Sequence, residues 1–180
     1  MTDQDEIMGK HSLWVRKVAG YMRAVLLNRL EEGKTGTITY GESAKLVRKK
    51  SAKTEPGGEL KVLPCRLHRS LGLLQELCRE RNLPCLPSLV VGKKTRIPGE
   101  GFYKAYAELD WQDQVEYPAI LENDERMRQI AEAEQEACCK RKHEDWKELR
   151  EALDTLIHGK RGNTSQVDGR SDIGFSTMAS

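Results

Sequence analysis

The sequence predicts an α+β fold that is mainly helical. Helical runs follow Thr39-Tyr40-Gly41-Glu42 and span residues 63–82, and two short apolar stretches, 88–91 and 102–106, flank a basic, glycine-rich segment at 92–101. We interpret this order as helix, helix and a small two-stranded β-hairpin, which is the outline of a winged helix. We expect a winged-helix-like domain at 12–118, a flexible arm at 1–11, a helical extension at 119–158 and a disordered tail at 159–180.

Composition excludes several classes of protein. The longest apolar runs are only a few residues, so no membrane span is expected. The acidic N-terminus lacks the apolar core of a secretory signal. The 5 cysteines are odd in number and irregularly spaced, which is typical of reduced thiols and favours a cytoplasmic location.

Charge is divided unevenly along the chain. Residues 1–107 hold 20 Lys and Arg against 11 Asp and Glu, whereas residues 108–180 hold 10 against 17. A basic globular part followed by an acidic helical part favours an anionic partner for the first part. The alternative is a solvated surface with chance asymmetry.

Two helices are expected before residue 60. The first begins near Ser12, a favourable N-cap, and repeats apolar residues at a spacing of three and four from Trp14 to Leu26. The second follows Thr39, which with Glu42 has the spacing of a capping box. It should end at a break over 51–58. Its outer side and end carry four candidate nucleic-acid-binding cations, Lys45, Arg48, Lys49 and Lys50.

The third helix would be the recognition helix of a winged helix. Pro64 suits a first helical position, and Arg66, His68 and Arg69 lie near the N-terminal end, where such helices approach bases and phosphates. Lys93, Lys94 and Arg96 would neutralise backbone phosphates from the hairpin tip. The alternative for both segments is an ordinary solvated surface.

The C-terminal helical region has two alternative roles. Apolar residues repeat near heptad spacing between Trp146 and Ile157. A homodimer through helix 141–158 would suit a protein that reads paired half-sites on DNA. Packing of the same stripe against the first helix of its own chain is equally compatible with the pattern.

We find no catalytic constellation in the sequence, which favours a binding protein over an enzyme. Cys65, His68, Cys78 and Cys85 lack the paired spacing of a zinc site, and Cys138-Cys139 project from a helix in different directions. Gly99-Glu100-Gly101 lacks the Lys-Ser/Thr end of a phosphate-binding P-loop. No metal or cofactor is expected.

Two resemblances add to this interpretation. Pro64-Cys65-Arg66-Leu67-His68 resembles the Pro-Cys-His-Arg-Val motif of O6-alkylguanine-DNA alkyltransferases, whose winged-helix domain also carries a Thr-Tyr-Gly segment, here at 39–41. That resemblance implies alkyl transfer to Cys65, although His68 is not adjacent to the cysteine and Arg66 occupies the histidine position. Residues 12–120 are also similar to small uncharacterised bacterial proteins that combine the Thr-Tyr-Gly-Glu, Asn-Leu-Pro and Leu-Val-Val…Pro-Gly-Glu-Gly-Phe patterns. This implies a winged-helix-like domain from a bacterium or mobile element.

The sequence therefore predicts a nucleic-acid-binding protein of winged-helix type, with DNA favoured as the ligand; a regulatory role and a dimeric state are left open. The first alternative is a protein–protein interaction module that acts through the C-terminal helix. The remote alternative is a cysteine-based protein of DNA alkyl damage.

Overall fold

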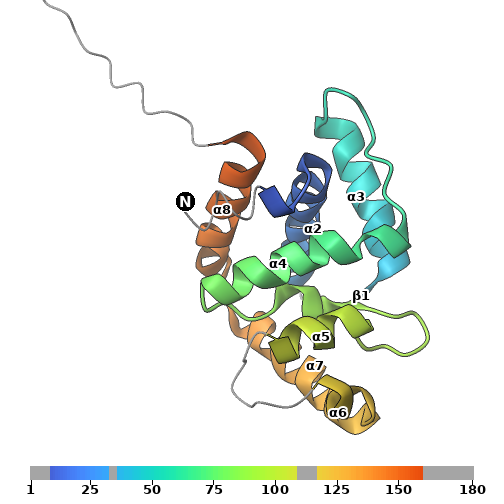
Figure 1. Ribbon diagram of the computed structural model, residues 1–180. Helices are drawn as coiled ribbons and strands as arrows, with labels where there is room; N and C mark the ends of the chain where they lie inside the picture. Colours follow the sequence, from blue (N-terminus) through green and yellow to red (C-terminus); the bar gives the residue numbers. More distant parts are fainter. Residues whose placement is uncertain (1–8, 33–35, 109–116, 160–180) are drawn as a thin grey trace, which may run out of the picture.

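The computed structural model describes residues 9–32, 36–108 and 117–159, and within them the chain is mainly helical (Figure 1). This confirms the predicted fold class. The predicted arm and tail lie almost entirely outside the described residues, as does the segment 109–116. The elements in order are α2 (Leu13–Glu31), β1 (Ile38–Thr39), α3 (Tyr40–Thr54), the 3-10 turn η1 (Pro64–Arg66), α4 (His68–Glu80), η2 (Leu86–Leu89), β2 (Val90–Val91), α5 (Glu100–Glu108), α6 (Tyr117–Leu121), α7 (Asp124–Lys140), η3 (His143–Trp146) and α8 (Lys147–His158).

Helix α2 is the centre of the larger hydrophobic core and packs against α3, α4 and α8. It begins as predicted, because the Ser12 hydroxyl oxygen accepts the amide N–H of Val15 at 3.4 Å. Val18, Met22 and Leu26 are fully buried along one side of the helix. Buried polar contacts add to the packing, since the Ser70 hydroxyl on α4 donates to the carbonyl oxygen of Val15 at 3.1 Å.

Helix α3 starts at the predicted capping box and runs further than expected. The Thr39 hydroxyl and the Glu42 carboxylate satisfy each other's backbone amides. The predicted break at 51–58 is wrong for its first four residues, which are helical to Thr54. Ser51 is fully buried, and its hydroxyl oxygen accepts the amide N–H of Leu60 at 2.9 Å, so this residue anchors the following loop from inside the helix.

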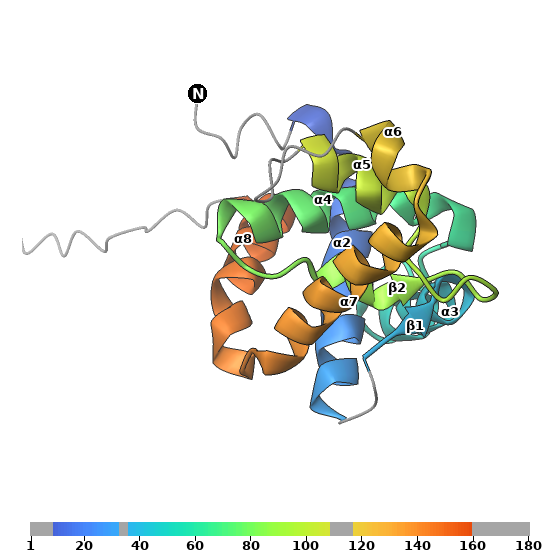
Figure 2. The ribbon, with the colours of Figure 1, turned by 90° about the horizontal axis from the view of Figure 1, so that it is seen from below.

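The sheet is parallel, which corrects the predicted hairpin. Ile38 pairs with Val90 and Thr39 with Val91, and Figure 2 shows β1 and β2 side by side. Parallel strands need a long crossover, which α3 and α4 supply here. The expected second strand, 102–106, is part of helix α5, so the described residues contain no antiparallel wing.

Helical spacing explains why α5 replaces the expected strand. Phe102 and Tyr103 are buried, and Tyr106 packs against the same smaller core. These three residues share one face of a helix, whereas in a strand Tyr103 would point to the face opposite Phe102 and Tyr106.

The third predicted helix is divided in the structure. Residues Pro64–Arg66 form η1 and α4 begins at His68, and the chain leaves α4 at Asn82 in a left-handed conformation, with φ of 50°.

The C-terminal helices complete both cores. The apolar stripe of α8 packs against α2, which is the second of the two roles left open by its sequence. Trp146, Leu149 and Leu153 are buried there. Helices α5, α6 and α7 enclose the smaller core around Phe102, Ile120 and Ile130. No helix in the described ranges is long and apolar enough to cross a membrane.

Candidate nucleic-acid interface

Helix α3 presents a row of lysines to solvent. Lys45, Lys49 and Lys53 follow one another at intervals of four residues, which places them along one face of the helix, and all three are exposed. The opposite face holds the buried residues Ala44 and Val47. Burial of that apolar face fixes the rotation of α3, so the lysines point away from the core.

A hollow of about 390 Å³ lies where α3 faces the last turns of α2. Its α3 wall carries Lys49, Lys50 and Lys53, and its α2 wall carries Arg29. Among the described residues, these three lysines form no ion pair. The remaining lining residues are one carboxylate, one amide and two apolar side chains: Glu32, Asn28, Val25 and Leu46.

The segment 92–98 is a tight loop instead of a hairpin tip. The amide N–H of Gly92 donates to the carbonyl oxygen of Ile97 at 2.9 Å, and that of Arg96 donates to the carbonyl oxygen of Gly92 at 3.0 Å. Arg96 adopts a left-handed φ of 60° at the closure. Lys93 and Lys94 are exposed in this loop. The loop therefore still presents the predicted cations, but on a different backbone.

Thr37 connects the loop to the hollow. The Arg96 guanidinium donates to its hydroxyl oxygen at 3.3 Å, and the Arg29 guanidinium donates to its carbonyl oxygen at 3.4 Å. We call the cations of the hollow, of the exposed row on α3 and of this loop together the basic surface; its members are Arg29, Lys45, Lys49, Lys50, Lys53, Lys93, Lys94 and Arg96. Glu42 lies beside it, in addition to Glu32 in the hollow. The pKa of Glu42 is lowered chiefly by the hydrogen bond from the Thr39 hydroxyl, with smaller contributions from Arg29 and Arg96.

Four predicted site residues are not members of the basic surface: Arg48, Arg66, His68 and Arg69. Arg48 is held by the protein itself, because its guanidinium donates to the carbonyl oxygen of Val62 at 2.7 Å and pairs with Glu59 at 3.3 Å. Arg66 and Arg69 are exposed near the start of α4. His68 is also exposed there, and its Nδ1 donates to the carbonyl oxygen of Cys65 at 3.0 Å.

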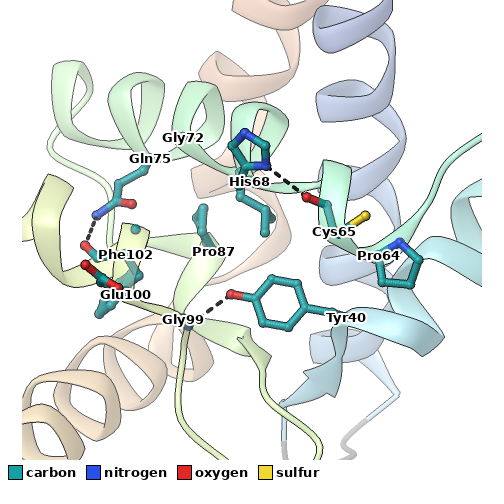
Figure 3. A pocket seen from close by; sticks show the side chains of 12 residues that line it. Tyr40, Pro64, Cys65, His68, Gly72, Gln75, Pro87, Gly99, Glu100 and Phe102 are labelled. Carbon is teal, nitrogen blue, oxygen red and sulfur yellow. Dashed lines mark hydrogen bonds between the residues drawn. The ribbon is translucent and has the colours of Figure 1, made fainter.

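A second hollow, of about 480 Å³, brings together three segments that sequence patterns had singled out (Figure 3). Tyr40 comes from the Thr-Tyr-Gly segment, Cys65 and His68 from the Pro-Cys segment, and Gly99 from the Pro-Gly-Glu-Gly-Phe segment. The Tyr40 hydroxyl oxygen accepts the amide N–H of Gly99 at 3.0 Å. The Gln75 side chain, which sequence reasoning missed, donates to the carbonyl oxygen of Phe102 at 3.1 Å. No periodic or motif signal marked Gln75 in advance.

The cysteines fall into two classes. Cys65 and Cys139 are exposed, whereas Cys78, Cys85 and Cys138 are buried. Burial raises the pKa of all three buried thiols, that of Cys78 to about 12. The His68 imidazole bonds the backbone of Cys65 and leaves the thiol without a hydrogen-bonded base in the described chain. No group of side chains in these ranges is arranged to hold a metal ion.

Thiol reactivity should follow this division. We expect two rapid equivalents with a colorimetric disulfide reagent at pH 8, from Cys65 and Cys139, because only an exposed thiolate attacks the reagent. The other three should react only on unfolding. A timed absorbance titration gives the count, and Cys65→Ser should leave one rapid equivalent. Three or more rapid equivalents in the folded protein would contradict the burial of Cys78, Cys85 and Cys138.

Comparison of the chain with protein-family models, with curated proteins and with solved structures finds no match.

Proposed function

We propose that this protein binds nucleic acid, with DNA as the first candidate, through the basic surface of α2, α3 and the loop 92–98. The observation that carries the proposal is the convergence of cations from three separate segments on one surface. Lys and Arg that neutralise phosphates release condensed counterions, and this release drives binding that is largely independent of sequence. Phosphate contacts of this kind position a nucleic acid without reading its bases.

The dimensions of α3 suit a phosphate backbone. From Lys45 to Lys53 the helix rises by about 12 Å. Because each strand of a duplex advances about 3.4 Å per nucleotide, this row of lysines spans roughly three to four nucleotides. The proposal differs from the winged-helix expectation, since α3 takes the place that sequence reasoning gave to the helix at 64–82. No base contact is assigned to Arg66 or Arg69.

The apolar surface that the main alternative from the sequence requires is buried within the chain. A protein-interaction module or a homodimer through 141–158 would have used the apolar stripe of α8, but Trp146, Leu149 and Leu156 are buried against the rest of the chain. Either assembly would have to use the opposite, charged face of that helix. The cysteine-based alternative has an exposed thiol at Cys65 in the second hollow, but the nearby histidine is bonded elsewhere.

The test is a salt series with a fluorescent duplex. Lys45→Ala/Lys93→Ala/Lys94→Ala removes three exposed cations of the basic surface outside the hollow. If each contacts one phosphate, the slope of log K against log salt should fall by about two to three units. The loss of affinity should be similar for duplexes of unrelated sequence.

A matched control separates local contacts from overall charge. Lys140→Ala/Lys147→Ala/Arg150→Ala removes the same charge from exposed positions on α7 and α8. This variant should keep the affinity and the salt slope of the parent. The proposed function would be overturned if the parent did not bind the duplex, or if both variants lost affinity and salt slope equally.

A further inference from the structure

We infer that the hollow between α2 and α3 binds a phosphate monoester, either the 5′-terminal phosphate of a nucleic-acid strand or a free nucleotide. This deepens the proposed function, on which the strand-end source depends. The first observation is the position of the cations in the two helices. Lys49, Lys50 and Lys53 continue the three-and-four spacing of Leu46, which is the spacing by which neighbouring helices normally pack apolar residues.

The helix α2 wall has the same spacing. Val25, Asn28, Arg29 and Glu32 face the α3 residues across the hollow. Two packed helices would ordinarily close such a seam with apolar side chains on both sides. Here only Val25 and Leu46 are apolar, so the seam opens into a concave space lined by cations.

Ordinary helix chemistry accounts for part of this arrangement. Arg29 and Lys53 lie in the last turns of α2 and α3, where a cation offsets the helix dipole. That effect explains neither Lys49 nor Lys50, nor the gathering of four cations around one carboxylate. Arg29 is also incompletely bonded. Its Nε is shielded from solvent and has no hydrogen-bond partner in the described chain.

The charge and size of the hollow favour a terminal phosphate over one in the middle of a strand. A monoester carries a charge of about −1.5 to −2 near pH 7, whereas a backbone diester carries only one negative charge. A mid-strand phosphate also has a sugar on each side, which a concave site must exclude. The volume of about 390 Å³ falls in the usual range of small-ligand sites, so a phosphate and its attached sugar fit together. Val25 and Leu46 offer apolar contact to the organic part.

The experiment compares two oligonucleotides that differ only in one group. The same 3′-labelled single strand, with either a 5′-phosphate or a 5′-hydroxyl, is titrated with the full-length protein at fixed salt. Charge-assisted hydrogen bonds to the extra phosphate should make the phosphorylated strand bind about tenfold more tightly or better. Calorimetric titration with adenosine 5′-monophosphate and with adenosine tests the free-nucleotide source, and only the phosphorylated compound should bind.

Two double variants locate the effect. Lys49→Gln/Lys53→Gln removes two charges of the hollow at exposed positions and should abolish the preference for the 5′-phosphate. Lys45→Gln/Lys93→Gln removes the same charge from the basic surface outside the hollow. It should weaken the binding of both oligonucleotides equally and leave the ratio of their two affinities unchanged. Circular dichroism of both variants checks that the helices are retained.

The outcomes distinguish this inference from the proposed function. Equal affinity for the two oligonucleotides, with no binding of the nucleotide, overturns the inference while strand binding stands. Nucleotide binding without any strand binding supports the inference and overturns the proposed function. If Lys49→Gln/Lys53→Gln keeps the preference for the 5′-phosphorylated strand, the phosphate binds outside the hollow and the inference is overturned.

Discussion

Replacing Trp146 with alanine should lower the free energy of unfolding by about 3–5 kcal/mol, the usual cost of truncating a buried tryptophan. Trp146 is only 2% exposed and belongs to the same core as α2. It ends η3 immediately before α8, and a small hollow beside it is lined by Leu27 and Leu30 of α2. The indole therefore helps attach α8 to the central helix, and its removal leaves a cavity that the two helices can close only in part.

Urea unfolding followed by tryptophan fluorescence and circular dichroism measures this change. Lys147→Ala is the control, since Lys147 is the next residue and is exposed. It should alter the free energy of unfolding by no more than about 0.5 kcal/mol. A cost below about 1 kcal/mol for Trp146→Ala would mean that α8 contributes little to the cooperative core, contrary to its packing on α2.

Local chemistry made parts of the fold predictable. Ser12 as an N-cap and the reciprocal pair of Thr39 and Glu42 are each decided by side chains within a few residues of the backbone groups they satisfy. Parallel pairing of Ile38 with Val90 depends on how α3 and α4 carry the chain between the strands, which no local pattern encodes. The stretch 102–106 was ambiguous because five residues fit either a strand or a turn and a half of helix.

At the candidate site, too, the residues that local patterns did not mark depend on contacts between separate helices. Lys49 and Lys50 were named from sequence because they fall at the end of the expected helix, whose outer side is basic. Arg29 and Lys53 were not, because their role depends on the packing of α2 against α3, which no pattern within either helix encodes. Arg48, by contrast, looked like its neighbours in sequence. Its partners Glu59 and Val62 lie in the loop after the helix, so the structure gives it a different task.

Glu134→Ala should destabilise the protein by about 1–3 kcal/mol through the loss of a single hydrogen bond. The Glu134 carboxylate accepts the amide N–H of Cys85 at 2.7 Å, and Cys85 is fully buried. Alanine leaves that N–H without its acceptor at the junction between α7 and the segment that leads into η2. Glu134→Gln keeps an acceptor oxygen at the same place and should cost less. Urea unfolding at pH 7 compares the two variants, and equal losses would show that the hydrogen bond is not the cause.

The pH dependence of the glutamine variant provides an independent check. Burial raises the pKa of Glu134, while the hydrogen bond from Cys85 acts in the opposite direction. A raised pKa means that the folded state binds the proton more tightly than the unfolded chain does. Stability therefore falls as the pH rises from the unfolded value, about 4.3, through the raised folded value. The parent should gain stability relative to Glu134→Gln between pH 7 and pH 4, because glutamine does not titrate. Parallel stability curves over that range would place the Glu134 carboxyl group in contact with solvent.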